Sequence, residues 1–181
     1  MVSFIYFSVI LLELIFLFSF IIFVSFLIYS NIKGSPYVPT RNKELDLILK
    51  QAKLKKGQYF YELGSGNGKV VRKAVKNYYV KGVGIDINPI LVLLSKALSK
   101  LQRIKKIEFK CDNILNSDIS KANVIYLFLL PKLLDSLLPK LEKELIPNTI
   151  VISHGFKIDS WKNKLFKTIK NKPFSTYFYR K

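Results

Sequence analysis

The stretch YELGSGNG, residues 61–68, decides the fold of this chain. Its first residues end an apolar run at 58–63 that is typical of a buried strand, and its last residue begins a helical pattern at 68–79. Glycines at alternate positions let the backbone turn sharply and approach a ligand closely. The first turn of the following helix presents free N–H groups to the same place. The stretch therefore predicts a strand, a ligand-binding loop and a helix in succession.

Strands and helices are predicted to alternate around this loop. The predicted strands are residues 58–63, 81–87, 107–111, 123–129, 149–153 and 174–180, and the predicted helices are 42–54, 68–79, 89–101 and 132–145. Apolar strands that alternate with helices predict an α/β fold, a Rossmann-like doubly wound, mostly parallel sheet. Pro139 interrupts the last helical pattern, which leaves open one kinked helix or two short ones.

The spacing of the glycines and of two acidic residues limits which ligand the loop can bind. Gly64, Gly66 and Gly68, with Ser65 between the first two, give GxGxG, whereas a dinucleotide-binding loop carries GxGxxG. Glu62 would repel a pyrophosphate but suits a ligand with an ammonium and a sulfonium centre. Asp86 ends the next predicted strand, where a carboxylate can accept both hydroxyls of a ribose. These features predict S-adenosyl-L-methionine as the cofactor.

Further polar residues follow the other predicted strands at the same sheet edge. Asn88 follows Asp86, and Asp112 and Asn113 follow the third strand, where they offer acceptors to an adenine amino group. The fourth strand runs into Leu130 and Pro131, where the substrate is expected to lie. The alternative is that the glycines and acids are ordinary turn residues, but four landmarks in order favour the cofactor site.

The N-terminal segment is apolar and lacks positive charge. Residues 3–29 contain one ionisable side chain, Glu13, and the first basic residue is Lys33. As a helix, these 27 positions would extend about 40 Å, enough to cross a bilayer core of about 30 Å. We predict a transmembrane helix at 1–30, a linker at 31–41 and a catalytic domain at 42–181. The basic residues after the span place that domain in the cytoplasm, and the features of a cleaved signal peptide are missing.

Charge and cysteine content limit the partners. The chain carries 30 basic and 12 acidic residues, a formal charge of +18. This balance suits nucleic acid, an anionic lipid surface or an acidic protein, and a solvated lysine-rich surface explains it equally well. Cys111 is the single cysteine, so neither an internal disulfide nor a cysteine-based metal site is predicted. We predict no metal ion.

Four segments together resemble a known enzyme family. GSPYVPT, YELGSGNGKVV, GIDINP and VIYLFLLPKLLDSLLPKL resemble class I S-adenosylmethionine-dependent methyltransferases. More narrowly, they are similar to the membrane-anchored protein-lysine N-methyltransferases that modify the adenine nucleotide translocase and the ATP synthase c-subunit. The resemblance covers roughly residue 36 to the C-terminus. It implies a seven-stranded methyltransferase sheet and a substrate among membrane proteins, with the bilayer contacted through the N-terminal helix.

The resemblance also implies roles for individual residues. Glu62 and the three glycines would belong to the methionine end of the cofactor, Asp86 to the ribose and Asp112 to the adenine. Pro39 and Thr40 would lie near the cofactor and the substrate entrance. Apart from the resemblance, Tyr37 and Tyr126 are candidates for an aromatic pocket that holds a methylammonium group, or serve only in packing. The sequence departs from the family at Asn123, where relatives often carry an acid. The resemblance does not identify which protein this chain modifies, because no residue in the sequence is seen to encode that choice.

The sequence does not decide which molecule accepts the methyl group or which side chain removes the acceptor's proton. Methyl transfer is an in-line displacement, for which a lysine acceptor must first lose a proton. His154, the only histidine, follows the fifth predicted strand and is the candidate base, although a histidine at such a position is more often structural. The alternatives are a lipid or small amine as the acceptor, RNA as the acceptor, or a scaffold without activity. Nucleic acid is disfavoured because no RNA-binding module is recognisable.

Overall fold

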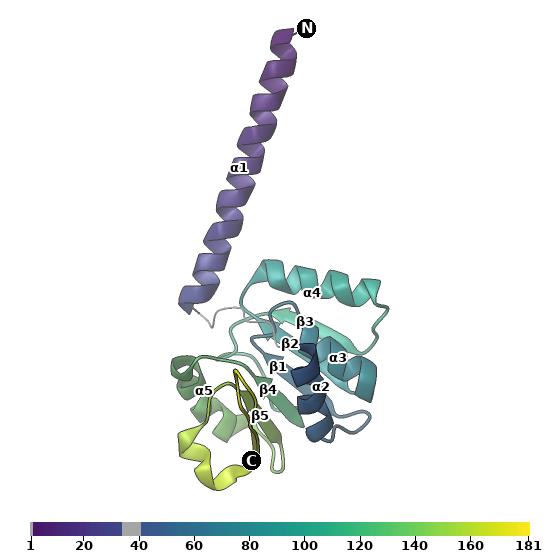
Figure 1. Ribbon diagram of the computed structural model, residues 1–181, viewed down its shortest axis with the longest axis vertical. Coiled ribbons are helices and arrows are strands. Elements are labelled where there is room, and N and C mark those ends of the chain that lie inside the picture. Colours follow the sequence, from purple (N-terminus) through teal and green to yellow (C-terminus); the bar gives the residue numbers. More distant parts are fainter. Residues whose placement is uncertain (1, 34–40) are drawn as a thin grey trace.

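The computed structural model describes residues 2–33 and 41–181, with side chains of the first helix described at residues 6–25. Helix α1 (Val2–Lys33) stands apart from the remaining elements in Figure 1. Its segment Tyr6–Ser25 is long and apolar enough to cross a membrane, and none of it is buried against the rest of the protein. The helix continues to Lys33 and so extends into the range that was predicted as linker.

A seven-stranded sheet forms the centre of the domain, as predicted for the methyltransferase type (Figure 1). The strand order is β3-β2-β1-β4-β5-β7-β6. Strands β1 to β5 are parallel, and β7 is antiparallel to both of its neighbours. The bounds are β1 Tyr59–Leu63, β2 Lys81–Asp86, β3 Ile107–Cys111, β4 Val124–Leu127, β5 Ile150–His154, β6 Leu165–Ile169 and β7 Thr176–Arg180. The order reverses between β1 and β4, which is where such sheets bind ligands.

Helices cover both faces of the sheet. Successive strand residues point to opposite faces, and the two faces bury separate cores. The first core packs against α2 (Asn42–Gln51), α3 (Lys69–Tyr78) and α4 (Pro89–Leu101). The second core packs against α5 (Pro131–Glu144) and the 3₁₀ helix η1 (Asp159–Lys164). The result is the three-layer arrangement expected for a doubly wound sheet.

Two elements near the C-terminus were not predicted. Strand β6 and helix η1 occupy residues 159–169, for which no element was expected from the sequence. β6 lies at the sheet edge with alternate residues exposed, so it lacks the apolar run of the central strands. Helix α2 ends at Gln51, before the predicted residue 54, and α5 is a single helix that contains Pro139.

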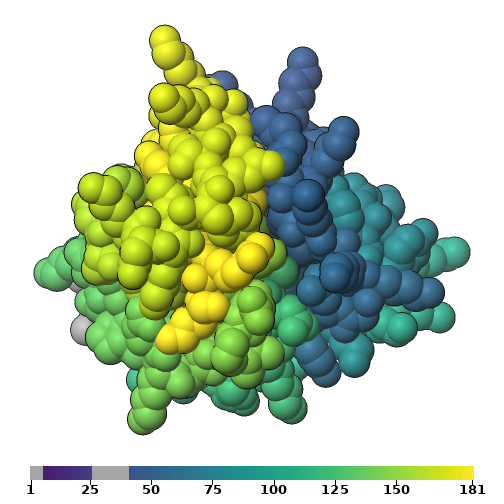
Figure 2. All heavy atoms as spheres, turned by 90° about the horizontal axis from the view of Figure 1, so that it is seen from below, coloured from purple at the N-terminus to yellow at the C-terminus, as the bar shows by residue number. Residues whose placement is uncertain are grey.

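The C-terminal part of the chain packs beside α2, although more than a hundred residues separate them in sequence. Figure 2 shows the C-terminal segment next to the helix that begins at Asn42. Lys167 of β6 donates a hydrogen bond to the side chain of Gln51, and Phe178 of β7 is buried in the core that includes α2. Helix α2 therefore shares a buried core with residues of β4, β5 and β7.

Candidate active site

The glycine loop after β1 has the backbone that its sequence requires. Gly64, Gly66 and Gly68 all have positive φ, at 76°, 52° and 69°, where a residue with a Cβ is strained. A Cβ at Gly68 would lie 2.3 Å from Phe109 Cε1, and one at Gly64 would lie 2.9 Å from Leu129 Cδ2. Both conformation and packing therefore demand glycine at these two positions, and the loop stays close to the sheet.

Asp86, at the end of β2, holds the glycine loop. Its Oδ2 accepts a hydrogen bond of 2.6 Å from the Gly66 amide, and its Oδ1 accepts one of 2.9 Å from the Asn88 amide. Burial raises the pKa of this carboxyl, and the backbone hydrogen bonds oppose that shift. The two loops that were predicted to hold the cofactor are thus joined through one carboxylate.

Glu62, at the end of β1, is more strongly perturbed. Its Oε2 accepts a hydrogen bond of 2.9 Å from the Val71 amide of α3. Burial raises the pKa of Glu62 from 4.5 to about 8; the charge of Asp86 adds to this shift and Arg72 opposes it. Without a ligand the carboxyl is therefore mostly protonated at neutral pH. A cation placed beside it would restore the charged form.

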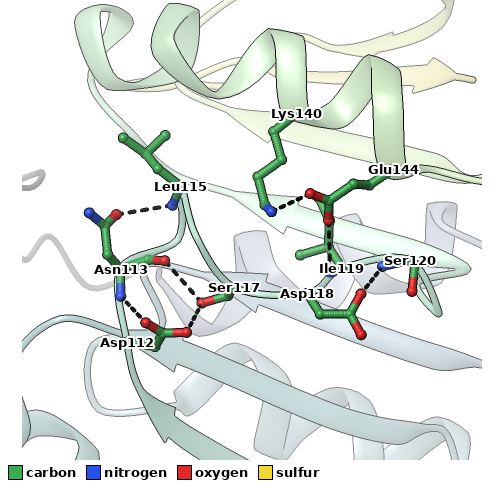
Figure 3. Close-up of polar contacts among 9 residues, drawn as sticks. All are labelled: Asp112, Asn113, Leu115, Ser117, Asp118, Ile119, Ser120, Lys140 and Glu144. Atoms are coloured by element: carbon green, nitrogen blue, oxygen red, sulfur yellow. Dashed lines mark hydrogen bonds and ion pairs between the residues drawn. The ribbon is translucent and has the colours of Figure 1, made fainter.

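Asp112 and Asn113 form a hydrogen-bonded loop after β3 (Figure 3). Oδ1 of Asp112 accepts from the Asn113 amide at 2.7 Å, and its Oδ2 accepts from the Ser117 hydroxyl at 2.5 Å. The Asn113 side chain accepts from the Leu115 amide at 3.0 Å. The Asp112 amide donates to the carbonyl of Asp86 at 3.0 Å, which ties this loop to the end of β2.

Asn88 and Ser65, two of the predicted cofactor residues, differ in their side-chain contacts. Asn88 is the N-cap of α4, because its side chain accepts from the amides of the helix's first turn at 3.0 and 3.3 Å. Ser65 is buried, and its hydroxyl has no hydrogen-bond partner among the described residues. Ser95, which was not predicted from the sequence, donates to the Gly66 carbonyl at 3.0 Å. These contacts fix the loop and leave direct contact of Asn88 and Ser65 with a cofactor as a prediction.

The predicted substrate side follows β4. Leu130 is the N-cap residue of α5 and Pro131 its first residue, and both are exposed at the carboxyl end of the sheet. Leu129, just before them, faces the glycine loop. Tyr37, Pro39 and Thr40 lie outside the described residues, so the predicted entrance segment stays a prediction.

His154, at the end of β5, is completely buried in an aromatic surrounding. Its Nδ1 is 2.8 Å from the Thr176 hydroxyl, and its ring centroid is 4.5 Å from that of Phe128 and 5.9 Å from that of Phe174. Burial lowers the pKa of His154 to about 4, so the imidazole is neutral at pH 7. Its Nε2 faces the Glu44 carboxylate at 3.9 Å.

Several residues of this edge could not be found from sequence motifs. Glu44 of α2 stands in a lysine-rich amphipathic segment, and no spacing in the sequence marks it as buried. Phe128 is one of several apolar residues in the predicted fourth strand, and Ser117 gives no signal because its contact with Asp112 depends on the fold of the loop. Only the loop residues were accessible to motif reasoning, since they are adjacent in sequence.

The residues at the ends of β1, β2 and β3 fit the expected cofactor. Glu62 is a buried carboxyl that stays mostly protonated unless a cation lies beside it. Asp86 retains acceptor capacity on both oxygens, and Asp112 is an exposed acceptor one strand further along. An ammonium, a ribose diol and an adenine amino group supply the donors that these three sites need. The order of the sites along the sheet edge matches the order of those groups in S-adenosyl-L-methionine.

Comparison with known proteins decides the family. Residues 62–165 match the model of the ANTKMT methyltransferase domain. The chain belongs to this methyltransferase family. A protein-lysine N-methyltransferase from Saccharolobus islandicus (strain REY15A) is 38% identical over 139 residues, which cover 75% of the chain and 85% of the relative. The human lysine N-methyltransferase of the ATP synthase c-subunit is 27% identical over 127 residues, covering 70% of the chain and 54% of the human protein.

Solved structures agree on the fold and on the cofactor of this methyltransferase. An RNA methyltransferase from Salinibacter ruber, in complex with S-adenosyl-L-homocysteine, superposes with a TM-score of 0.76 and 33% identity, covering 79% of the chain and 93% of that structure. A ribosomal protein L11 methylase from Lactobacillus delbrueckii subsp. bulgaricus superposes at 0.66 with 16% identity, covering 75% and 76%, and supports the fold alone. The methyltransferase uses S-adenosyl-L-methionine, as predicted.

Proposed function

We propose that this methyltransferase is a membrane-anchored protein-lysine N-methyltransferase that modifies a membrane-associated protein from the cytoplasmic side. The relative from Saccharolobus islandicus carries the proposal for the acceptor, because it is a protein-lysine N-methyltransferase that is 38% identical and aligns over 85% of its own length. The human relative, which methylates a lysine of the ATP synthase c-subunit, supports a membrane protein as the target.

The cofactor supplies a methyl group on a sulfonium, and the protein's residues hold and shield it. We assign the methionine end to Glu62 and to the loop of Gly64, Ser65, Gly66 and Gly68. The carboxylate of Glu62 binds the ammonium, which offsets the burial that otherwise keeps it protonated.

At the other end of the cofactor, Asp86 accepts from the ribose hydroxyls, while Asn88 fixes the position of Asp86 through its amide. Asp112 and Asn113 lie beside the adenine. The acceptor enters past the exposed Leu130 and Pro131, and we assign the segment of Tyr37, Pro39 and Thr40 to the same entrance.

His154 does not serve well as an independent base for the acceptor. Both ring nitrogens face protein groups, Thr176 at 2.8 Å and Glu44 at 3.9 Å. A pKa of about 4 makes the imidazole a weak proton acceptor at neutral pH. Removal of the acceptor's proton therefore needs a further group.

Two surfaces support anchoring to a bilayer. The first is α1, whose segment Tyr6–Ser25 has the length and composition of a membrane span. The second is the outer face of α4, where Leu93 is 69% and Leu101 is 79% exposed. Lys96 and Lys100 are exposed on the same helix. Exposed leucines beside lysines are typical of helices that rest on anionic lipid. Basic residues after α1 support a cytoplasmic location of the domain.

RNA is the second candidate acceptor. It is favoured by the 33% identity to the Salinibacter ruber RNA methyltransferase and by the formal charge of +18, since Lys and Arg bind phosphates without sequence preference. A span at α1 argues against it, because anchoring keeps the domain away from most RNA.

Labelling of membranes tests the proposal. Membranes from a deletion strain are incubated with the full-length protein and radiolabelled S-adenosyl-L-methionine, and Asp86→Ala serves as the inactive control. We expect label in a protease-sensitive band whose hydrolysate contains methyllysine. Label in an organic extract or in a nuclease-sensitive fraction would instead identify a lipid amine or RNA as the acceptor.

A further inference from the structure

The first turn of α2 places a buried acid against the only histidine. The Glu44 side chain is 9% exposed, and its Oε2 lies 3.9 Å from His154 Nε2, which belongs to a side chain that is 1% exposed. This separation is too long for a hydrogen bond. Among the described residues, Oε1 of Glu44 and Nε2 of His154 are buried without a hydrogen-bond partner. Helix α2 and strand β5 thus bring Oε2 of Glu44 toward an imidazole nitrogen that lacks a partner, and the second carboxylate oxygen, Oε1, lacks one as well.

The tautomer of His154 decides what this pair needs, because the Thr176 hydroxyl can either donate to Nδ1 or accept from it. When His154 carries its proton on Nδ1 and donates to Thr176, Nε2 presents a lone pair toward the carboxylate. A buried carboxylate without a cation or donors is costly. The nearest cationic partner found among the described residues is the imidazole itself, which is neutral at pH 7 because burial lowers its pKa. An ammonium group, with three N–H donors, would satisfy both acceptors.

The pair lies on the acceptor side of the cofactor site. In the sheet, Glu62 is opposite Tyr126, and Tyr126 is opposite Ile152. His154 follows Ile152 by two residues and therefore points to the same face as Glu62. Strand β4 alone separates their strands, which are about 10 Å apart, and because His154 lies two residues further along, the two positions are about 12 Å apart.

We propose that Glu44, with His154, forms the binding site for the cationic amine that this enzyme methylates. The inference rests on the proposed lysine acceptor and deepens it. The acceptor's ammonium donates to the Glu44 carboxylate and to Nε2 of His154. The ring of Phe128, whose centroid lies 4.5 Å from that of the imidazole, adds apolar surface beside His154.

The same pair takes up the proton that methylation requires the amine to lose. An N–H bond of the ammonium breaks, its electron pair stays on nitrogen, and the proton forms an O–H bond with the Glu44 carboxylate. The neutral amine then has the lone pair needed to attack the methyl carbon. The proton stays on the pair until the product leaves. Glu44 and His154 both contact the acceptor's nitrogen in this scheme, and Glu44 takes its proton.

The single histidine allows a direct binding test. The full chain in detergent micelles is saturated with S-adenosyl-L-homocysteine and titrated with n-butylammonium, which copies the end of a lysine side chain. Because His154 is the only histidine, its imidazole NMR signals are unambiguous. We expect a saturable shift with n-butylammonium and none with n-butanol, its neutral analogue.

Glu44→Gln keeps the side chain's shape and removes its charge. We expect it to weaken n-butylammonium binding by about 10-fold to 100-fold, because a charge-assisted hydrogen bond is lost. The matched control is Asp46→Asn on the same helix, whose side chain is 57% exposed and pairs with Lys73. It should leave the binding at the wild-type level. In the labelling assay, Glu44→Gln should raise KM or lower kcat for the methylated protein while affinity for S-adenosyl-L-homocysteine is unchanged.

Other results would overturn the inference. A Glu44→Gln variant that binds n-butylammonium and turns over like the wild type shows that Glu44 is not part of the amine site. A parallel loss of S-adenosyl-L-homocysteine affinity and thermal stability shows a structural role only. If lysine is labelled and Glu44→Gln has no effect, the inference fails and the proposed function stands. If only lipid amines are labelled and the probe still requires Glu44, the lysine proposal fails and the amine site stands.

Discussion

Replacing Glu62 with Gln tests the electrostatics of the cofactor site. The folded-state pKa of about 8 exceeds the reference value of 4.5, so the folded protein binds this proton more tightly than the unfolded chain does. The stability that the protonated carboxyl contributes is complete below pH 4.5 and is lost as the pH rises toward 8. The shift corresponds to about 5 kcal/mol in total, of which about 3 kcal/mol is lost by pH 7.

Gln is neutral at every pH and retains an oxygen that can accept from the Val71 amide. The difference in unfolding free energy between wild type and Glu62→Gln should therefore change by about 3 kcal/mol between pH 4.5 and pH 7 in the absence of ligand. Urea denaturation of the full chain in micelles measures it. Fluorescence of Trp161, the only tryptophan, reports on the domain because this side chain is buried.

Cofactor binding supplies the second half of the same test. If an ammonium beside Glu62 favours the charged carboxylate, then binding of S-adenosyl-L-homocysteine at pH 7 should release about one proton. Calorimetry in buffers of different ionisation enthalpy measures that release, and Glu62→Gln should abolish it. Parallel stability curves for the two proteins, with equal proton release, would refute both the raised pKa and the assignment of Glu62 to the ammonium.

Three further substitutions test the packing around the site. Gly68→Ala should destabilise the protein by about 1–3 kcal/mol, because positive φ is strained and the new Cβ meets the Phe109 ring; thermal unfolding will measure the loss. Ser117→Ala removes the donor to Asp112 and should weaken S-adenosyl-L-homocysteine binding about 3-fold to 10-fold, measured by calorimetry; unchanged affinity would place the adenine elsewhere. Tyr179→Phe leaves a buried backbone amide without its acceptor and should cost about 1–3 kcal/mol, whereas a urea midpoint equal to the wild type's would contradict this.

The cofactor loop was predictable because its signal is local. Residues 61–68 carry the turn, the glycines and the first acid within one segment, and Asp86 follows at the end of the next strand. The bounds of α4 and β3 agree with the predicted ranges. The edge strand β6 was missed, because its half-exposed residues do not form the apolar run that marks a buried strand.

The sequence by itself determined the fold class, the cofactor and the family, because periodicity and short motifs encode contacts between residues that are close along the chain. Only the tertiary structure decided that Glu44 faces His154. These residues lie far apart in the sequence, and their meeting depends on how α2 packs across the parallel sheet. Burial likewise decided the protonation of Glu62 and His154, since a pKa shift of this kind arises from the loss of water around a group, which no local pattern records.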